Sequence, residues 1–209
     1  MITIVGINHT EKFENQLLKI IKNINPDVIF LELDRLNFKL LREELSQKEI
    51  KSYFSSMPST FKLLSMYKAK SKNDKFVDRM WDSKFVLKLS KNFGFKIIPI
   101  DMDKKELYEQ IELEISFSEK FRILRSVIKK LFFKNSKMDN SKEYVQRFPT
   151  LNKYLIEKRS KYMANEIIKN ARSFNDILVL VGNNHLESFK KLIVYDDKKI
   201  ISLDEFRDI

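Results

Sequence analysis

Cysteine is absent from this chain of 209 residues, which excludes disulfides, a thiol nucleophile and thiolate metal ligands. Its absence fits a cytoplasmic protein. No apolar run approaches the roughly 18 residues of a membrane-spanning helix, and no secretory signal is recognisable, so we expect no transmembrane segment. Only three glycines, four prolines and two histidines occur, and the positions of such scarce residues are therefore informative.

Basic residues outnumber acidic residues by 40 to 29, which gives a formal net charge of +11. The excess is densest in Lys62–Lys75 and Lys129–Lys142. Clusters of this kind can bind nucleic acid or an anionic membrane, but more often they are solvated surface. No aromatic and basic RNA-binding motif accompanies them, so we expect no nucleic-acid partner.

The two histidines lie in matching sequence surroundings. A glycine closes each of two aliphatic runs, and a histidine follows each glycine by three residues: Gly6 and His9 after Ile2–Val5, and Gly182 and His185 after Ile177–Val181. Unbroken aliphatic runs are typical of strands buried on both faces of a parallel sheet. Glycine at the end of a strand permits a sharp turn and close backbone approach. A lone histidine there would most simply make a loop hydrogen bond, but the duplication favours a functional site.

Strands alternating with helices predict an α/β fold, with a mostly parallel central sheet flanked by helices. The expected strands are Ile2–Val5, Val28–Leu33, Phe95–Ile100, Ile177–Val181 and Lys199–Leu203. We expect one domain over 1–209, with helical insertions at about 46–92 and 104–172. The first two strands and the helix between them form a β-α-β unit, so we expect them to be parallel neighbours with a right-handed crossover.

Several scarce or polar residues predict where the helices end. Gly94 is a good helix stop, and Pro58 and Ser116–Ser118 are expected breaks. Thr10 is a candidate cap for the first helix. Loops are expected at Ser71–Asp74 and Lys134–Lys142.

Polar residues follow four of the expected strands: His9, then Glu32 with Asp34, then Asp101 with Asp103, then His185. The carboxyl ends of parallel strands lie on one edge of a sheet, where α/β proteins bind ligands. Two histidines and a carboxylate suit a catalytic divalent ion such as zinc, manganese, cobalt or iron. Without a metal, one histidine would be a general base oriented by Glu32 or Asp101. The alternative for each carboxylate is a helix cap or an ion pair.

The chain resembles the TraB family over nearly its whole length. This family includes the pheromone-shutdown proteins and is related to the Tiki metalloproteases. Five segments match its motifs in order: Gly6–His9 its first Gly-x-x-His, Pro26–Asp34 its PD-apolar-ELD strand, Ile100–Asp103 its IDRD turn, Leu155–Ala164 its LIEERDxYMA helix, and Val181–Leu186 its VGxxHL ending. The resemblance implies an α/β fold with a helical insertion.

By similarity to the Tiki branch, the resemblance also implies metal-dependent peptide cleavage. The implied site residues are His9, Glu32 and His185 around a divalent ion. Arg159 matches the arginine of the family's helix motif. This arginine would either stabilise a developing oxyanion or form a salt bridge with Glu32 or Asp101.

Five positions depart from the family's pattern. Met102 replaces an arginine in the turn, Ser160 replaces an acid in the helix motif, and Asn37 replaces an arginine after the second strand. Ile7 and Ser188 replace a hydroxyl residue and a glycine near the two histidines. The departures therefore fall on residues near the implied site, whereas the implied metal ligands His9, Glu32 and His185 are present.

Together with this resemblance, the sequence predicts a metal-dependent hydrolase that is peptidase-like. Its expected substrate is a peptide or a small molecule. Two alternatives stay open: a non-catalytic protein that sequesters a peptide or small ligand, and a metal-free, esterase-like hydrolase. The long apolar helices around Phe117–Phe133 can also serve a homodimer.

Overall fold

The computed structural model describes residues 1–8, 13–70, 80–132, 145–195 and 197–202. Its chain divides into two compact units. The sheet unit comprises Met1–Arg42, Val77–Met102 and Arg159–Ile209, and the helical unit comprises Glu43–Phe76 and Asp103–Lys158. The expectation of a single domain over 1–209 stays a prediction.

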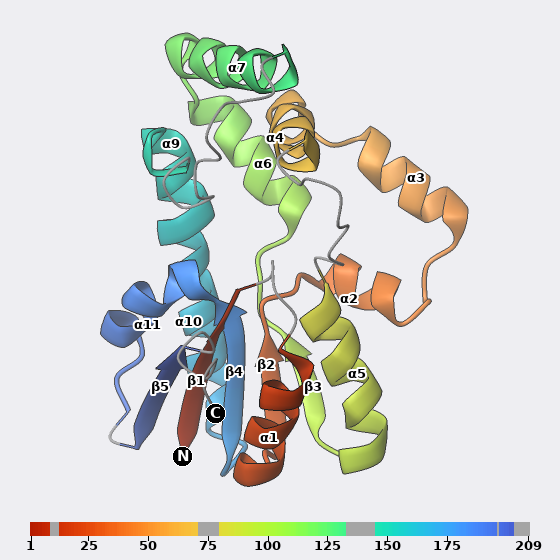
Figure 1. Ribbon diagram of the computed structural model, residues 1–209, viewed down its shortest axis with the longest axis vertical. Helices are drawn as coiled ribbons and strands as arrows, with labels where there is room; N and C mark the ends of the chain where they lie inside the picture. The colour runs from red at the N-terminus through yellow and green to blue at the C-terminus, as the bar shows by residue number, and fades with distance from the viewer. Residues whose placement is uncertain (9–12, 71–79, 133–144, 196, 203–209) are drawn as a thin grey trace. The chain divides into compact units, whose positions relative to one another are not determined.

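A five-stranded, all-parallel sheet forms the centre of the sheet unit (Figure 1). Its strands are β1 (Ile2–Ile7), β2 (Val28–Leu31), β3 (Lys96–Pro99), β4 (Ile177–Gly182) and β5 (Lys198–Ser202). Their spatial order is β3-β2-β4-β1-β5, and every neighbouring pair is parallel. The predicted α/β fold with a parallel sheet flanked by helices is therefore confirmed.

The expectation that the first two strands pair with each other was wrong. β4 lies between β1 and β2 and pairs with both. Every residue of β4 is buried, which suits a strand with neighbours on both sides. A β-α-β connection requires parallel strands and a right-handed crossover, but it does not require that the two strands be adjacent.

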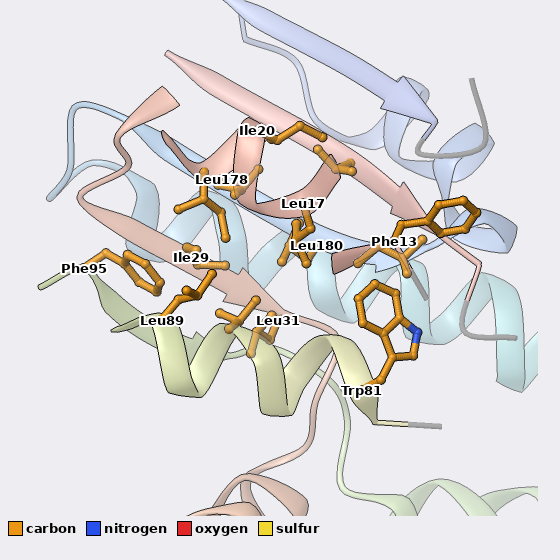
Figure 2. Close-up of a cluster of buried hydrophobic side chains, with 14 of the residues drawn as sticks. Phe13, Leu17, Ile20, Ile29, Leu31, Trp81, Leu89, Phe95, Leu178 and Leu180 are labelled. Carbon is orange, nitrogen blue, oxygen red and sulfur yellow. The ribbon is translucent and has the colours of Figure 1, made fainter. Parts of the chain in front are cut away.

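Two apolar clusters cover the two faces of the sheet, because successive residues of an apolar strand point to opposite sides. In β4, Leu178 and Leu180 face one cluster, whereas Ile177, Val179 and Val181 face the other. Figure 2 shows the first cluster, in which Trp81 packs near the strand ends. This cluster is built on α1 (Glu14–Ile24) and α5 (Trp81–Phe93), and the second on α10 (Arg159–Ala171) and α11 (Leu186–Leu192).

Local signals end the helices of this unit largely as expected. Gly94 caps α5 in the left-handed conformation with φ of 75°, which glycine adopts without strain. His185 is the last residue of a short 3-10 turn, η2 (Asn183–His185), and α11 follows directly. The expected cap Thr10 and the expected loops at Ser71–Asp74 and Lys134–Lys142 lie outside the described residues.

The helical unit includes the helical segments α3 (Gln47–Ser55), α4 (Ser59–Lys70), α6 (Lys104–Glu114), α7 (Phe117–Phe132), α9 (Pro149–Asn152) and the π-helical η1 (Lys153–Lys158). The breaks predicted at Pro58 and Ser116–Ser118 are confirmed. Among the described residues, no helix is both long and apolar enough to cross a bilayer.

The order of the strands creates a topological switch point between β2 and β4. The helix that leads from β2 towards β3 is α5, on one face of the sheet, and the helix that leads from β4 to β5 is α11, on the other. Neighbouring connections that leave on opposite faces open a crevice at the carboxyl ends of the strands, and α/β proteins bind ligands there. Glu32 and Gly182 stand at this point.

Candidate active site

Backbone and side-chain hydrogen bonds join the ends of β2 and β4. The Glu32 backbone N–H donates to the Leu180 carbonyl at 3.0 Å. The Glu32 side chain joins the same two strands, because its Oε2 accepts a hydrogen bond from the Gly182 backbone N–H at 2.6 Å. The Glu32 side chain is only 12% exposed, so this carboxylate is held in place at the switch point.

Arg159 links Glu32 to Asp101, which follows β3. Its Nε donates to Asp101 Oδ1 at 2.9 Å and its Nη2 to Asp101 Oδ2 at 2.7 Å, a bidentate pair, while Nη2 also lies 2.7 Å from Glu32 Oε1. Burial alone would lower the pKa of Arg159, but the negative charges of Asp101 and Glu32 outweigh that and raise it. Arg159 is therefore a permanent cation between two carboxylates.

The backbone around Arg159 is irregular, because α10 begins at this residue directly after the six π-helical residues of η1. π-Helical turns are rare and are frequently found at functional sites. This local irregularity is consistent with a functional demand on the position of Arg159.

His185 is buried, with 2% of its surface exposed. Its Nε2 lies 3.4 Å from Glu32 Oε1, and its Nδ1 lies 2.8 Å from the Ser160 hydroxyl oxygen. A partner on one ring nitrogen sets the tautomer and the orientation of the ring, and so decides what the other nitrogen can do. Ser160 thus directs His185 Nε2 towards Glu32.

These contacts form one network of side chains from three strand ends and one helix. Among the described side chains of this network, two carboxylates surround a single guanidinium. Buried net charge is costly unless a counter-charge is close. Arg159 is therefore the counter-charge that both carboxylates share.

The other two strand-end carboxylates cap helices. Asp34 is fully buried, and it accepts from the Asn37 backbone N–H at 2.8 Å and the Asn37 side-chain amide at 2.5 Å, at the start of α2 (Arg35–Leu41). Asp103 caps α6 by accepting from the Glu106 backbone N–H at 3.0 Å. The helix-cap alternative therefore holds for these two residues, whereas Glu32 and Asp101 belong to the network.

The first Gly-x-x-His segment is described only in part, because His9 lies outside the described residues. Gly6 pairs with Val181 and Ile7 with Gly182 in the register of β1 and β4. A side chain at Gly6 would collide with the side chains of Asn183 and Leu186. Gly6 thus serves close approach, whereas Gly182 has φ of −63°, which any residue can adopt.

The structure brings together four of the predicted site residues: Glu32, Asp101, Arg159 and His185. Sequence reasoning missed Ser160, the partner of His185 Nδ1, which it treated only as a departure from the family's helix motif. The one available signal was its position directly after Arg159, where the family motif has an acid. An acid and a serine can both hydrogen-bond a ring nitrogen.

His185 and Glu32 have a spacing that fits two ligands of one metal ion. Two ligand atoms at about 2.1 Å from a tetrahedral ion lie about 3.4 Å apart, and His185 Nε2 and Glu32 Oε1 are 3.4 Å apart. The described residues contain no group of three histidine, cysteine or acidic side chains placed to hold an ion. Two ligands are therefore described, and a third would have to come from elsewhere in the chain.

Comparison with known proteins adds one distant relative. The chain is 21% identical over 212 aligned residues to an uncharacterized protein of Methanocaldococcus jannaschii, and the match covers 92% of this chain. The chain spans about half of that relative's length, since 53% of it is covered. No family model and no solved structure matches the chain, so the resemblance to the TraB family stays a prediction.

Proposed function

We propose that this chain is a TraB-like hydrolase in which His185 and Glu32 act at the switch point between β2 and β4. The observation that supports this function most strongly is the pairing of His185 Nε2 with Glu32 Oε1, 3.4 Å apart and buried. Three contacts fix the two side chains. The Ser160 hydroxyl holds His185, and the Gly182 backbone N–H and the Arg159 guanidinium hold Glu32. Such support is what preorganised catalytic groups require.

The proposed hydrolase is metal-dependent, with His185 and Glu32 as two ligands of a divalent manganese, zinc, cobalt or iron ion and His9 as the third. The 3.4 Å spacing of His185 Nε2 and Glu32 Oε1 supports this assignment. When bound, such an ion supplies Lewis acidity, which polarises a carbonyl and acidifies water. Amide or ester hydrolysis is the reaction class that uses this chemistry, and a peptide is the proposed substrate.

Within this proposal Arg159 and Asp101 position Glu32. The bidentate contact fixes the guanidinium plane on Asp101, and the remaining contact of Nη2 then orients the Glu32 carboxylate. These ion pairs support a positioning role for Arg159 over direct stabilisation of an oxyanion. A cytoplasmic location, which the absence of cysteine suggests, is part of the same proposal.

A metal-free hydrolase is the second candidate. Both Glu32 oxygens already accept hydrogen bonds from Arg159 and Gly182, and His185 has the oriented ring of a general base. Ser160 is completely buried on α10, so in this candidate it orients His185 and a water molecule is the nucleophile.

Hydrolysis of a pool of fluorogenic peptides and esters separates these functions. The purified protein would be assayed as isolated, after chelation, and after restoring each of the four metal ions. We expect the wild type to be active, chelation to abolish its activity, and one of the four ions to restore it. His185→Ala and Glu32→Gln should both be inactive. Glu109→Gln, an exposed acid on α6, is the matched control and should keep full activity.

Two results would contradict the metal-dependent proposal. Activity that persists after chelation and requires His185 would establish the metal-free hydrolase instead. Saturable binding of a peptide or small ligand without turnover in any condition would show a sequestering protein.

A further inference from the structure

Helix α7 presents two different apolar faces. Ile123 and Val127 are buried, and they lie on the face that packs within the helical unit, where α7 contacts α4. Four other apolar residues recur at helical spacing on a second face and are exposed: Phe117, Phe121, Leu124 and Ile128. These four residues are called the α7 face. A helix that already buries one apolar stripe does not need a second one for folding.

The α7 face is larger than scattered surface residues would produce. Phe117 is 85% exposed and Phe121 is 59% exposed, so at 150–250 Å² for a free aromatic side chain the two rings present roughly 200–350 Å² of apolar surface. Leu124 and Ile128 extend it along the helix. The largest apolar patch of a typical monomer is of this size, and such a patch is often functional.

Basic residues border this face on one side. Arg122, Arg125 and Lys129 are exposed and follow the same side of the helix. Glu119, the only acidic residue of α7, is buried and accepts a hydrogen bond from the Thr150 backbone N–H at 3.1 Å. The solvent-facing charge of α7 among the described side chains is therefore entirely positive.

The arginines of this border line an open pocket of about 450 Å³. Its lining consists of Arg122, Arg125 and Arg147 with Ser126 and Phe148. The Arg122 guanidinium lies 5.7 Å from the centre of the Phe148 ring, which restricts its direction. Arginine is the side chain best suited to phosphate oxygens, and the described residues that line this pocket include no acidic side chain.

We propose that the α7 face and its arginine border dock on the surface of an anionic phospholipid bilayer. Apolar rings that enter the interface, beside cations that meet the headgroup phosphates, are the pattern of helices that lie in a membrane surface. Charge decides against a second copy of this chain as the occupant, because pairing two α7 helices would bring like charges together. This surface is separate from the candidate hydrolase site, and the proposal does not depend on that site.

Vesicle sedimentation with the full chain tests the proposal. The vesicles would be phosphatidylcholine alone, or an equal mixture of phosphatidylcholine and phosphatidylglycerol. We expect binding to the mixed vesicles only, weakened by added salt. Phe117→Ser with Phe121→Ser, and separately Arg122→Gln with Arg125→Gln, should each lower the binding constant by at least about tenfold. Val194→Ser removes an equally exposed apolar side chain from the sheet unit and should have no effect.

Circular dichroism of each variant confirms that the helices remain. Equal binding to both vesicle types, or no binding to either, would overturn the proposal. A dimer in analytical ultracentrifugation that the two serine substitutions dissociate would assign the α7 face to a second copy. Retention on nucleic acid that the two glutamine substitutions abolish, without binding to vesicles, would assign the arginines to a different partner.

Discussion

At the scale of the residue, Arg159 determines the geometry of the candidate site, because its guanidinium contacts carboxylates that follow two different strands. Removing charges from water is costly, and a buried ion pair often adds little to stability over an apolar replacement. The benefit of such a network is the fixed arrangement of its members. We therefore expect a large loss of stability when Arg159 alone is replaced and its two carboxylate partners remain charged.

Replacing Arg159 alone should be strongly destabilising. Arg159→Met leaves the buried Glu32 and Asp101 without a counter-charge, and we expect a loss of about 3–5 kcal/mol in the free energy of unfolding. Adding Glu32→Gln and Asp101→Asn removes both charges and should recover much of that loss. Urea unfolding followed by the fluorescence of Trp81, the only tryptophan, measures both variants. A triple variant no more stable than Arg159→Met would contradict the ion-pair explanation.

Ser160 is expected to set the tautomer of His185. The hydroxyl oxygen lies 2.8 Å from His185 Nδ1, so Ser160→Ala should convert one dominant tautomer into a mixture. Nitrogen-15 chemical shifts of the imidazole report this directly, and His9→Gln assigns the signals because the chain has only two histidines. Ser188→Ala on α11 is the matched control. Unchanged His185 shifts in Ser160→Ala would rule out the orienting role.

The sequence identified most of this network but not all of it. Two histidines and four strand-end carboxylates are recognisable because such residues are scarce or follow apolar runs. The difference between Glu32 and Asp34 was not predictable, because both follow the same strand and only the turn decides which one faces Arg159. Ser160 was overlooked because a serine in a helix carries no signal of its own.

At the scale of the element, acidic side chains hold helices of the helical unit together. Glu112 of α6 accepts from the Ser59 hydroxyl at 2.8 Å and from the Thr60 backbone N–H at 3.0 Å, at the start of α4. Glu119 of α7 likewise accepts a hydrogen bond from the Thr150 backbone N–H at the start of α9. Acceptors at helix N-termini satisfy free N–H groups and favour the helix dipole.

Glu112 makes the stability of this unit pH-dependent. Burial alone would raise its pKa, but hydrogen bonds from Lys120, Thr60 and Ser59 outweigh this and lower it from 4.5 to about 2. A lowered folded pKa means stabilisation that is complete above about pH 4.5 and disappears as the pH falls towards 2. Because Glu112 is partly exposed, solvent screening reduces the contribution to on the order of 1–2 kcal/mol.

Thermal unfolding of Glu112→Gln, followed by circular dichroism across this pH range, measures the contribution. The variant should be less stable than the wild type at pH 7, and the two should converge near pH 2. Glu109→Gln on the same helix removes only an exposed pair with Lys105, 3.9 Å apart, and should change little at any pH. A difference between wild type and Glu112→Gln that does not vary with pH would disprove the capping role of the carboxylate.

Elements were predicted best where one residue type decides the local backbone. Gly94 ends α5, and Pro58 separates α3 from α4. The unbroken aliphatic runs became strands buried on both faces. The position of β4 between β1 and β2 was not predictable from local patterns, because it depends on which strands bury most surface together once the chain has collapsed.

At the scale of the whole molecule, the strand order explains how residues far apart in the sequence meet. β1 and β2 both pair with β4, so the ends of these two strands lie beside the same neighbour. Helices on opposite faces then make the carboxyl ends of β2 and β4 a switch point of the sheet. The candidate site belongs entirely to the sheet unit, whereas the α7 face belongs to the helical unit.

The metal content of the purified protein tests the central claim most directly. The protein would be isolated without chelators and without nickel affinity, and manganese, zinc, cobalt and iron would be measured per chain. The account predicts a near-stoichiometric ion in the wild type and in Glu109→Gln, and its loss in His185→Ala. No bound ion in any of the three, even after incubation with each metal, or an undiminished ion in His185→Ala, would contradict it.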